Sequence, residues 1–269
     1  MLVLIKGAGD LASGVAHRLV KSGFKVVMTE IAQPTMVRRT VSYGEAVYDN
    51  CAVVEGVTAR KVSAVSSMHS LWEKGEIPVV VDPQALIVEE LKPDVIVDAI
   101  LAKRNTGTFR GQAPLTIGLG PGFTAGQDVD VVVETMRGHY LGTVIYSGSA
   151  MPDTGVPGEI GSHSIKRLLR APAAGIFKGH YQIGDQVSES DVVGEVAGSP
   201  VQAQIAGVLR GLIRTGTTVF AGMKIGDIDP RGKIEHCFSI SDKARAIAGG
   251  VLEAILSKID NTSIRFKDF

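Results

Sequence analysis

A segment in the carboxyl-terminal half of the chain occurs twice, and this repeat constrains the fold more than any other feature of the sequence. Residues 171–196 align without gaps on residues 203–228, at an offset of 32 positions. Most of the identical positions are glycines at turn spacings, such as Gly184 and Gly216. Self-similarity at a fixed offset is typical of a structural unit that packs against its own copy, so the sequence predicts a duplicated β unit.

The duplicated unit resembles the biotinyl/lipoyl barrel-sandwich hybrid, in which two four-stranded halves are related by a pseudo-twofold axis. The likeness lies in the short strands and in the recurring Gly-Asp and Ala-Gly turns. In carrier domains of that kind, the modified lysine lies at the hairpin that joins the halves. The corresponding junction, residues 197–202, contains no lysine. We therefore expect a rigid docking or scaffold module with no covalent biotin or lipoate.

The amino-terminal half alternates short apolar runs with helical stretches. The expected strands are residues 2–5, 25–29, 79–81 and 95–97, with helices around 62–72 and 85–91. Strands that alternate with helices predict a parallel sheet. The β-rich stretch 115–146 is expected to complete this domain.

We therefore predict an α/β fold class with three parts. The parts are a Rossmann-like parallel sheet domain at 1–165, a small all-β barrel-sandwich hybrid at 166–232 and a C-terminal helical segment at 233–269. Apolar residues recur at helical spacing in the last part, and Ser241 is the expected N-cap. Gly249 and Gly250 within that helix each cost about 1 kcal/mol relative to alanine, which indicates close packing against another element.

The turn after the first expected strand carries a cofactor-binding pattern. Gly7, Gly9 and Ala12 satisfy G-x-G-x-x-A between a strand and a helix, and Glu30 lies where an acidic residue would bind a ribose hydroxyl. Asp10, however, places a carboxylate where backbone N–H groups would meet a pyrophosphate. Either Asp10 turns away at the start of the helix, or the ligand is not an ordinary dinucleotide.

Three further segments supply candidate ligand-binding residues. One of them is 134–139, where Arg137 and His139 would point to the same side of an extended strand. Lys103 and Arg104 follow an expected strand, where a ligand of an open α/β sheet binds, and they could hold an anion there. The glycine-rich segment 118–126 after another strand would let the backbone approach a ligand. The cofactor-binding candidates outside the first turn are therefore Lys103, Arg104, Asn105, Gly120, Gly122, Arg137 and His139. No spacing of histidines or cysteines indicates a metal site.

Composition excludes several classes of function. The chain has 269 residues and a formal net charge of zero, with 5% aromatic residues, which argues against binding to nucleic acid. Cys51 and Cys237 are far apart in the sequence and form no C-x-x-C pair, which fits a reducing cytoplasm. Glycines and prolines interrupt the longest uncharged stretch, so we expect no membrane span.

Several strings together identify a family resemblance over nearly the whole chain. They are KGAGDLASGVAHRL, MTEIAQPTMVRRTVSYGEAVYD, VDAILAKRNTGT, IGLGPGFTAGQDVDVVVETMRGHYLG, DTGVPG and KIGDIDPRG followed by CFSISDKARAIAGGVLEAIL. These strings resemble the YqeB-type accessory proteins of selenium-dependent molybdenum hydroxylases, which are distantly related to XdhC-type maturation factors. The resemblance implies a molybdopterin-type cofactor or a nucleotide as the bound ligand and a molybdenum hydroxylase apoprotein as the partner. It adds Arg38 and Arg39 to the candidate surface.

Two functions therefore compete. One is a maturation factor that handles a phosphate-bearing molybdopterin cofactor and docks on a hydroxylase. The other is an NAD(P)-dependent oxidoreductase that uses the same G-x-G-x-x-A site. Glu30 and the glycine pattern favour the oxidoreductase. Asp10 and the family resemblance favour the maturation factor.

Overall fold

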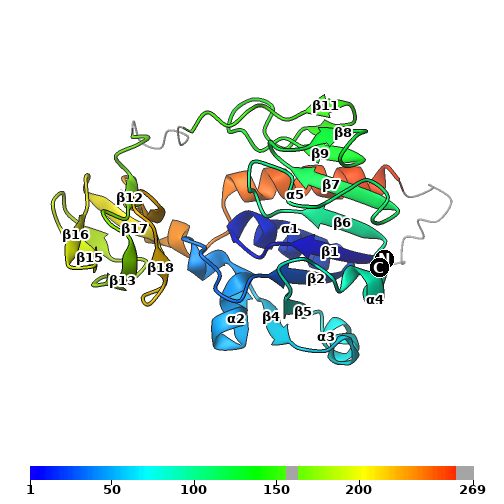
Figure 1. The fold of residues 1–269 in the computed structure, drawn as a ribbon, viewed down its shortest axis with the longest axis horizontal. Helices are drawn as coiled ribbons and strands as arrows, with labels where there is room; N and C mark the ends of the chain where they lie inside the picture. The colour runs from blue at the N-terminus through cyan, green and yellow to red at the C-terminus, as the bar shows by residue number, and fades with distance from the viewer. Residues whose placement is uncertain (156–162, 259–269) are drawn as a thin grey trace.

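The computed structural model describes residues 1–155 and 163–258, and these residues form two lobes (Figure 1). The first lobe is a large β-sheet with helices on both faces. The second, which we call the β-rich lobe, is built from residues 168–229. After it the chain returns to the first lobe, because the C-terminal helix α5 (Asp242–Leu256) packs beside the sheet.

Within the described residues, nine strands form the sheet of the first lobe, in the order β10-β9-β7-β6-β1-β2-β5-β4-β3. The strands from β9 to β4 in this order pair in parallel, whereas β10 and β3 pair antiparallel at the two edges. The strands are β1 Leu2–Lys6, β2 Lys25–Glu30, β3 Cys51–Val54, β4 Val57–Val62, β5 Ile77–Val81, β6 Val95–Asp98, β7 Leu115–Leu119, β9 Val131–Val133 and β10 Val144–Ile145. A separate pair, β8 (Thr124–Ala125) and β11 (Gly148–Ser149), lies beside β9.

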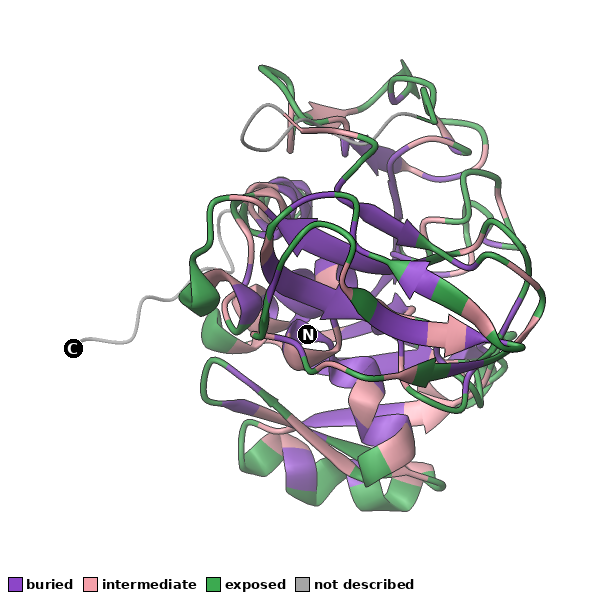
Figure 2. Ribbon diagram, turned by 90° about the vertical axis from the view of Figure 1, so that its left-hand side faces the viewer, coloured by how far each residue is buried: buried purple, intermediate pink, exposed green. Residues whose placement is uncertain are grey.

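Alternating side chains of the central strands build two cores. Val3 and Ile5 of β1 face the helices α1 (Asp10–Lys21) and α5, and Leu4 between them faces the opposite side. The helices on that opposite side are short: α3 Met68–Glu73 and α4 Val88–Leu91. Another short helix, α2 (Ala46–Asp49), precedes β3. The strands buried on both faces explain the continuous apolar runs in the sequence (Figure 2).

The β-rich lobe consists of two antiparallel sheets, each with four strands among the described residues, in the orders β12-β19-β17-β14 and β16-β15-β13-β18. Its strands are β12 Leu168–Arg170, β13 Gly175–Gly179, β14 Gln186–Val187, β15 Val192–Val196, β16 Ser199–Gln202, β17 Gly207–Leu212, β18 Thr218–Val219 and β19 Lys224–Asp229. Strands β13, β14 and β15 recur as β17, β18 and β19 at the predicted offset of 32 residues. Each sheet takes strands from both copies of the repeat, so neither copy forms a sheet of its own.

The predicted fold class is wrong. The first lobe is not a parallel Rossmann-like sheet, because its sheet is mixed and carries antiparallel strands at both edges. The β-rich lobe consists of separate antiparallel sheets rather than the predicted barrel-sandwich hybrid. The C-terminal helix belongs to the core of the first lobe, since Ile247 and Val251 are buried there.

The local errors have a physical cause. The expected helix at 62–72 begins only at Met68, because β4 continues to Val62 after a hairpin turn at Glu55 and Gly56, both at positive φ. The expected helix at 85–91 is also short, because Ala85 has a φ of +53° and the helix begins at Val88. Apolar runs that alternate with helical stretches indicate strands buried between helices, but they do not indicate short edge strands.

The start of α5 confirms the predicted cap, since Ser241 accepts a hydrogen bond from the N–H of Ala244. The two glycines in the middle of the helix differ in their surroundings. A Cβ on Gly250 would overlap the carbonyl oxygen of Gly142, whereas a Cβ on Gly249 would meet nothing within 4 Å. Close packing therefore requires glycine at position 250 but not at position 249. No described helix is long and apolar enough to cross a membrane.

We predict opposite effects of alanine at these two neighbouring positions. Gly250→Ala lowers the free energy of unfolding by about 1–3 kcal/mol, because the turn at Gly142 must move away from α5. Gly249→Ala raises it by up to about 1 kcal/mol through helix propensity. Urea denaturation of the two variants measures both changes, and equal effects would contradict the packing at Gly250.

Candidate functional site

A cleft of about 850 Å³ lies between the two lobes. On the side of the first lobe it is lined by the loops that follow β1, β2, β6 and β9 and by the first residues of α1 and α5. On the other side it is lined by β12 and by residues of β17 and β19. The strand order reverses direction at β1, with β2 on one side and β6 on the other, and ligands of open α/β sheets bind at such a point.

The glycine-rich turn from β1 to α1 forms one wall of the cleft. Gly7 has a φ of +91°, and a Cβ there would lie 3.1 Å from the carbonyl oxygen of Ala99, so both conformation and packing require glycine. Gly9 is different. Its φ of −71° and ψ of −177° suit any residue, and a Cβ there would meet nothing within 4 Å. Neither the backbone nor the protein's own packing explains the glycine at position 9.

Both long helices of the first lobe begin at this cleft. Gly14 of α1 packs against Ala244 of α5, and a Cβ on Gly14 would lie 2.7 Å from the Cβ of Ala244. No side chain caps the start of α1, and the backbone N–H groups of residues 9–12 donate no hydrogen bond to a described residue. Unpaired N–H groups at a helix start favour an anion.

Two acidic side chains lie close to this helix start. Asp10 lines the cleft, with a carboxylate oxygen 3.9 Å from Nη1 of Arg38. The Glu30 carboxylate accepts hydrogen bonds from the N–H groups of Ala8 and Ile31, both at 2.8 Å. Burial raises the pKa of Glu30, while these two hydrogen bonds act in the opposite direction. Asp10 therefore does not turn away from the cleft, and Glu30 already holds the turn in place.

Lys243, in the first turn of α5, is half-buried and lines the cleft. No ion pair or hydrogen bond joins its ammonium group to a residue that the structure describes. Burial lowers the pKa of Lys243, although the charge of Asp10 acts in the opposite direction. An anion in the cleft would supply the missing partner.

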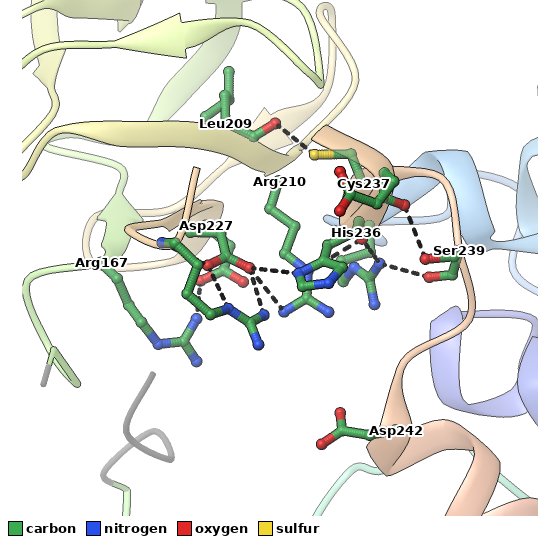
Figure 3. A network of polar contacts seen from close by, with 12 residues as sticks. Arg167, Leu209, Arg210, Asp227, His236, Cys237, Ser239 and Asp242 are labelled. Carbon is green, nitrogen blue, oxygen red and sulfur yellow. Dashed lines mark hydrogen bonds and ion pairs between the residues drawn. The ribbon is translucent and has the colours of Figure 1, made fainter. Parts of the chain in front are cut away.

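The β-rich lobe contributes cations that the sequence analysis did not find. Arg167 forms an ion pair with Asp227, and Arg210 lies near Asp229, both on the side of the lobe that faces Asp242 at the start of α5 (Figure 3). The further basic residues of this wall are Arg170 and Lys224. In total, eight basic and five acidic side chains among the described residues line the cleft, although the whole chain has no net charge.

Of the residues predicted from the sequence, Gly7, Gly9, Asp10, Ala12, Glu30, Arg38, Lys103 and Arg137 line the cleft. The last two are already paired. Lys103 donates to Asp153 at 2.5 Å and holds the pKa of that carboxyl below its usual range. Arg137 donates to both carboxylate oxygens of Asp242, at 2.6 and 3.0 Å, which holds the pKa of Asp242 far below its usual range.

The remaining predicted residues, Arg39, Arg104, Asn105, Gly120, Gly122 and His139, are not among those that line the cleft. Arg39 binds the carbonyl oxygen of Leu212 between the lobes. The side-chain oxygen of Asn105 accepts the N–H groups of residues 107 and 108 within its own loop. A Cβ on Gly122 would lie 2.6 Å from the backbone nitrogen of Arg104. His139 packs edge-on against Tyr140, with ring centroids 5.0 Å apart.

The described residues contain no group of three or more His, Cys, Asp or Glu side chains that could hold a metal ion. Guanidinium and ammonium side chains line the cleft, together with the backbone N–H groups at the start of α1. These groups recognise phosphate and carboxylate oxygens.

The fold and the cleft together define a two-lobed α/β protein with a basic cleft between its lobes. The chain is 54% identical over 255 residues to the Escherichia coli (strain K12) protein named "Uncharacterized protein YqeB". This match covers 95% of the chain and agrees with the YqeB-type resemblance of the sequence motifs. It covers 47% of the relative, so the chain spans about half the length of the curated protein that it matches. No protein-family model matches the chain.

Solved structures give only distant similarity. An aspartoacylase family protein from Mesorhizobium loti is 12% identical, with 84% of this chain and 83% of that one covered and a TM-score of 0.28. The ectoine utilization protein EutE from Ruegeria pomeroyi is 9% identical, with 84% of each chain covered and a TM-score of 0.27. A succinylglutamate desuccinylase from a Silicibacter species is 13% identical, with 84% of each chain covered and a TM-score of 0.25.

The names of these similar structures differ from the classification predicted from the sequence. They are names of aspartoacylase, ectoine utilization and desuccinylase proteins, and none of them is that of a molybdenum-cofactor maturation factor or a biotinyl/lipoyl-like domain. The descriptions "Rossmann-like" and "barrel-sandwich hybrid" fail on the sheet topology itself. At TM-scores below 0.5, none of these similarities transfers an activity to this chain.

We predict that Gly122 fixes the loop that carries Lys103. Gly122 and Gly126 both have positive φ, but only Gly122 packs against the loop, whereas a Cβ on Gly126 would meet nothing within 4 Å. Gly122→Ala therefore lowers the free energy of unfolding by about 1–3 kcal/mol more than Gly126→Ala does. Thermal denaturation compares the two variants, and equal losses would show that positive φ alone explains both glycines.

Proposed function

We propose that the protein binds a phosphate-bearing small molecule in the cleft, at the start of α1. The observation that carries this proposal is Gly9. Glycine at this position is required neither by its backbone angles nor by a neighbouring protein atom. A ligand that must approach the N–H groups of the first helical turn explains why no side chain is present there.

The surroundings of Gly9 support the same ligand chemistry. Helices α1 and α5 both begin at the cleft and direct the positive ends of their dipoles towards it. Lys243 supplies an ammonium without a described protein partner, and Arg38 supplies a guanidinium. Phosphate oxygens suit this set of donors, because charge-assisted hydrogen bonds to guanidinium groups are among the strongest in proteins.

Two contacts argue against an ordinary dinucleotide. The N–H of Ala8 is bound by Glu30, so it is not available to a pyrophosphate. The carboxylate of Asp10 lines the cleft beside the helix start and repels a second negative charge there. A single phosphate needs fewer N–H donors than a pyrophosphate, so the Ala8 contact favours a phosphate monoester, such as that of a molybdopterin-type cofactor, over NAD(P).

The biological role rests on the family resemblance. We propose that the chain is a cytoplasmic accessory protein that holds a molybdopterin-type cofactor or a nucleotide for a molybdenum hydroxylase, its partner. Contacts with nucleic acid or a membrane are not part of this proposal. An NAD(P)-dependent oxidoreductase is the alternative, and oxidation of NADPH by the purified protein in the presence of a carbonyl substrate would favour it.

The test is isothermal titration calorimetry with molybdopterin, AMP and NADPH as separate ligands. We predict that Gly9→Leu weakens binding at least tenfold and leaves the melting temperature unchanged, because the side chain enters the cleft and blocks N–H donors whose hydrogen bonds to a charged group contribute about 1.5–3 kcal/mol. Gly249→Leu is the matched control, since Gly249 also has open space but lies away from the cleft lining. Equal affinities in wild type and Gly9→Leu would contradict the proposal. Tryptophan fluorescence would report poorly on this cleft, because the indole N–H of Trp72 donates to the carbonyl oxygen of Val26, at the other end of β2.

The pH dependence of binding tests Lys243 separately. The groups that act on its charge are Asp10 of α1, Glu134 and Arg137 after β9, and Lys224 of β19. An anion favours the protonated ammonium, so affinity falls as the pH rises through the lowered pKa of Lys243. A phosphate monoester keeps a constant charge well above its second pKa of about 6. AMP affinity should therefore fall as the pH rises from neutral towards the ordinary lysine pKa of 10.5 in the wild type, and stay level in Lys243→Met. The same fall in both proteins would exclude Lys243 as the titrating group.

A further inference from the structure

We propose that the β-rich lobe carries a second oxyanion subsite, built by Arg210 with Arg167 and Arg38, so that the ligand of the cleft bears two separate phosphate or carboxylate groups. The inference rests on the proposed function, because it extends the same ligand from the start of α1 to the opposite wall. The ligand class is a small molecule with two oxyanion groups. Of the three arginines, the sequence analysis indicated only Arg38.

The three guanidinium groups are buried but incompletely paired. Their residues expose only 7% (Arg210), 8% (Arg167) and 8% (Arg38) of their surface. The Nε atoms of Arg38 and Arg167 are buried and have no hydrogen-bond partner. Arg210 donates only a long hydrogen bond, 3.4 Å from its Nε to the carbonyl oxygen of His236, and neither of its Nη atoms donates to a described residue. Buried polar groups are normally paired, so the Nε atoms of Arg38 and Arg167 need a further partner.

The nearby carboxylates do not supply that partner. Asp229 receives two short hydrogen bonds from Arg231, at 2.9 and 2.6 Å, while Arg210 lies 3.8 Å away. Asp227 is bound by Arg167. Burial and the positive charge of Arg38 lower the pKa of Arg210, although the charges of Asp227 and Asp229 act in the opposite direction. Arg38 and Arg210 both line the cleft, and an anion there would relieve the repulsion between their charges.

The duplication shows how Arg210 comes to face the cleft. Position 210 corresponds to Lys178 in the first copy, and Asp227 corresponds to Glu195. In the first copy, Lys178 lies opposite Glu195 and forms an exposed ion pair with it at 3.1 Å. In the second copy the strand register shifts at Arg210, so that Leu209 pairs with Ile228 but Gly211 pairs with Asp227. Such bulges redirect a side chain and are common beside binding sites.

The experiment measures binding of radiolabelled inorganic phosphate by equilibrium dialysis to the full chain and to four variants. We expect two bound phosphates in the wild type. Arg210→Met should lose one of them and keep the other, and Gly9→Leu should keep the one that Arg210→Met loses. Arg210→Lys should weaken the second site at least tenfold, because an ammonium lacks the planar fork of a guanidinium. Lys178→Met, at the corresponding position of the first copy, should bind two.

The outcomes separate this inference from the proposed function. A single phosphate that Gly9→Leu loses and Arg210→Met keeps would overturn the second subsite and leave the proposed function intact. A single phosphate that Arg210→Met loses and Gly9→Leu keeps would support the arginine subsite and overturn the proposed site at α1. No binding in the wild type would overturn both.

Thermal denaturation excludes a purely structural role for Arg210. We expect Arg210→Met to melt no lower than the wild type, because the variant removes a buried charge that Arg38 repels and leaves Asp229 paired with Arg231. Added phosphate should raise the melting temperature of the wild type more than that of Arg210→Met. A melting temperature several degrees lower in the variant, with phosphate binding unchanged, would show that Arg210 serves the fold and would overturn the inference.

Discussion

Arg38 is the residue through which the two lobes and the cleft are held together. Its Nη2 atom donates to the carbonyl oxygens of His236 and Ser239, at 2.9 and 3.1 Å, in the segment that leads from the β-rich lobe back to α5. Its Nη1 atom lies 3.9 Å from Asp10 at the start of α1. One buried side chain therefore fixes the starts of both long helices relative to the β-rich lobe. Hydrogen bonds from a charged group to part-buried carbonyl oxygens are costly to break, so this arrangement defines the shape of the cleft.

Main-chain contacts beside Arg38 make the junction rigid. The N–H of Leu212 donates to the carbonyl oxygen of Val37 at 2.9 Å, and Thr40 donates to the carbonyl oxygen of Cys237. A Cβ on Gly211 would lie 2.8 Å from the side chain of Val37, so the two segments approach as closely as neighbouring strands do. A site whose walls are fixed in this way binds its ligand without the entropic penalty of first ordering them.

The sequence predicted those features that depend on neighbours along the chain. The turn from β1 to α1, the position of Glu30 at the end of β2, the Ser241 cap and the 32-residue repeat all follow from local spacing, and the structure contains each of them. The antiparallel edge strand β3 was missed, because a strand of four residues beside a hairpin leaves no periodic signal. Strand β10 lies within the expected β-rich stretch, but its antiparallel pairing with β9 does not follow from local spacing. The error in fold class follows from these edges and from the sheets that exchange strands between repeats.

The arginine wall shows why the candidate site was only partly predictable. In the sequence, Lys178 and Arg210 are equivalent, since both are basic residues at the same position of a repeat. One becomes an exposed member of an ion pair and the other a buried residue of the cleft, and a register shift within one strand pair distinguishes them. In the sequence, this difference appears only as two substitutions between the copies, Lys178 to Arg210 and Glu195 to Asp227. A duplicated unit with one wall against solvent and one against a cleft can keep its fold in both copies while only the second acquires binding groups.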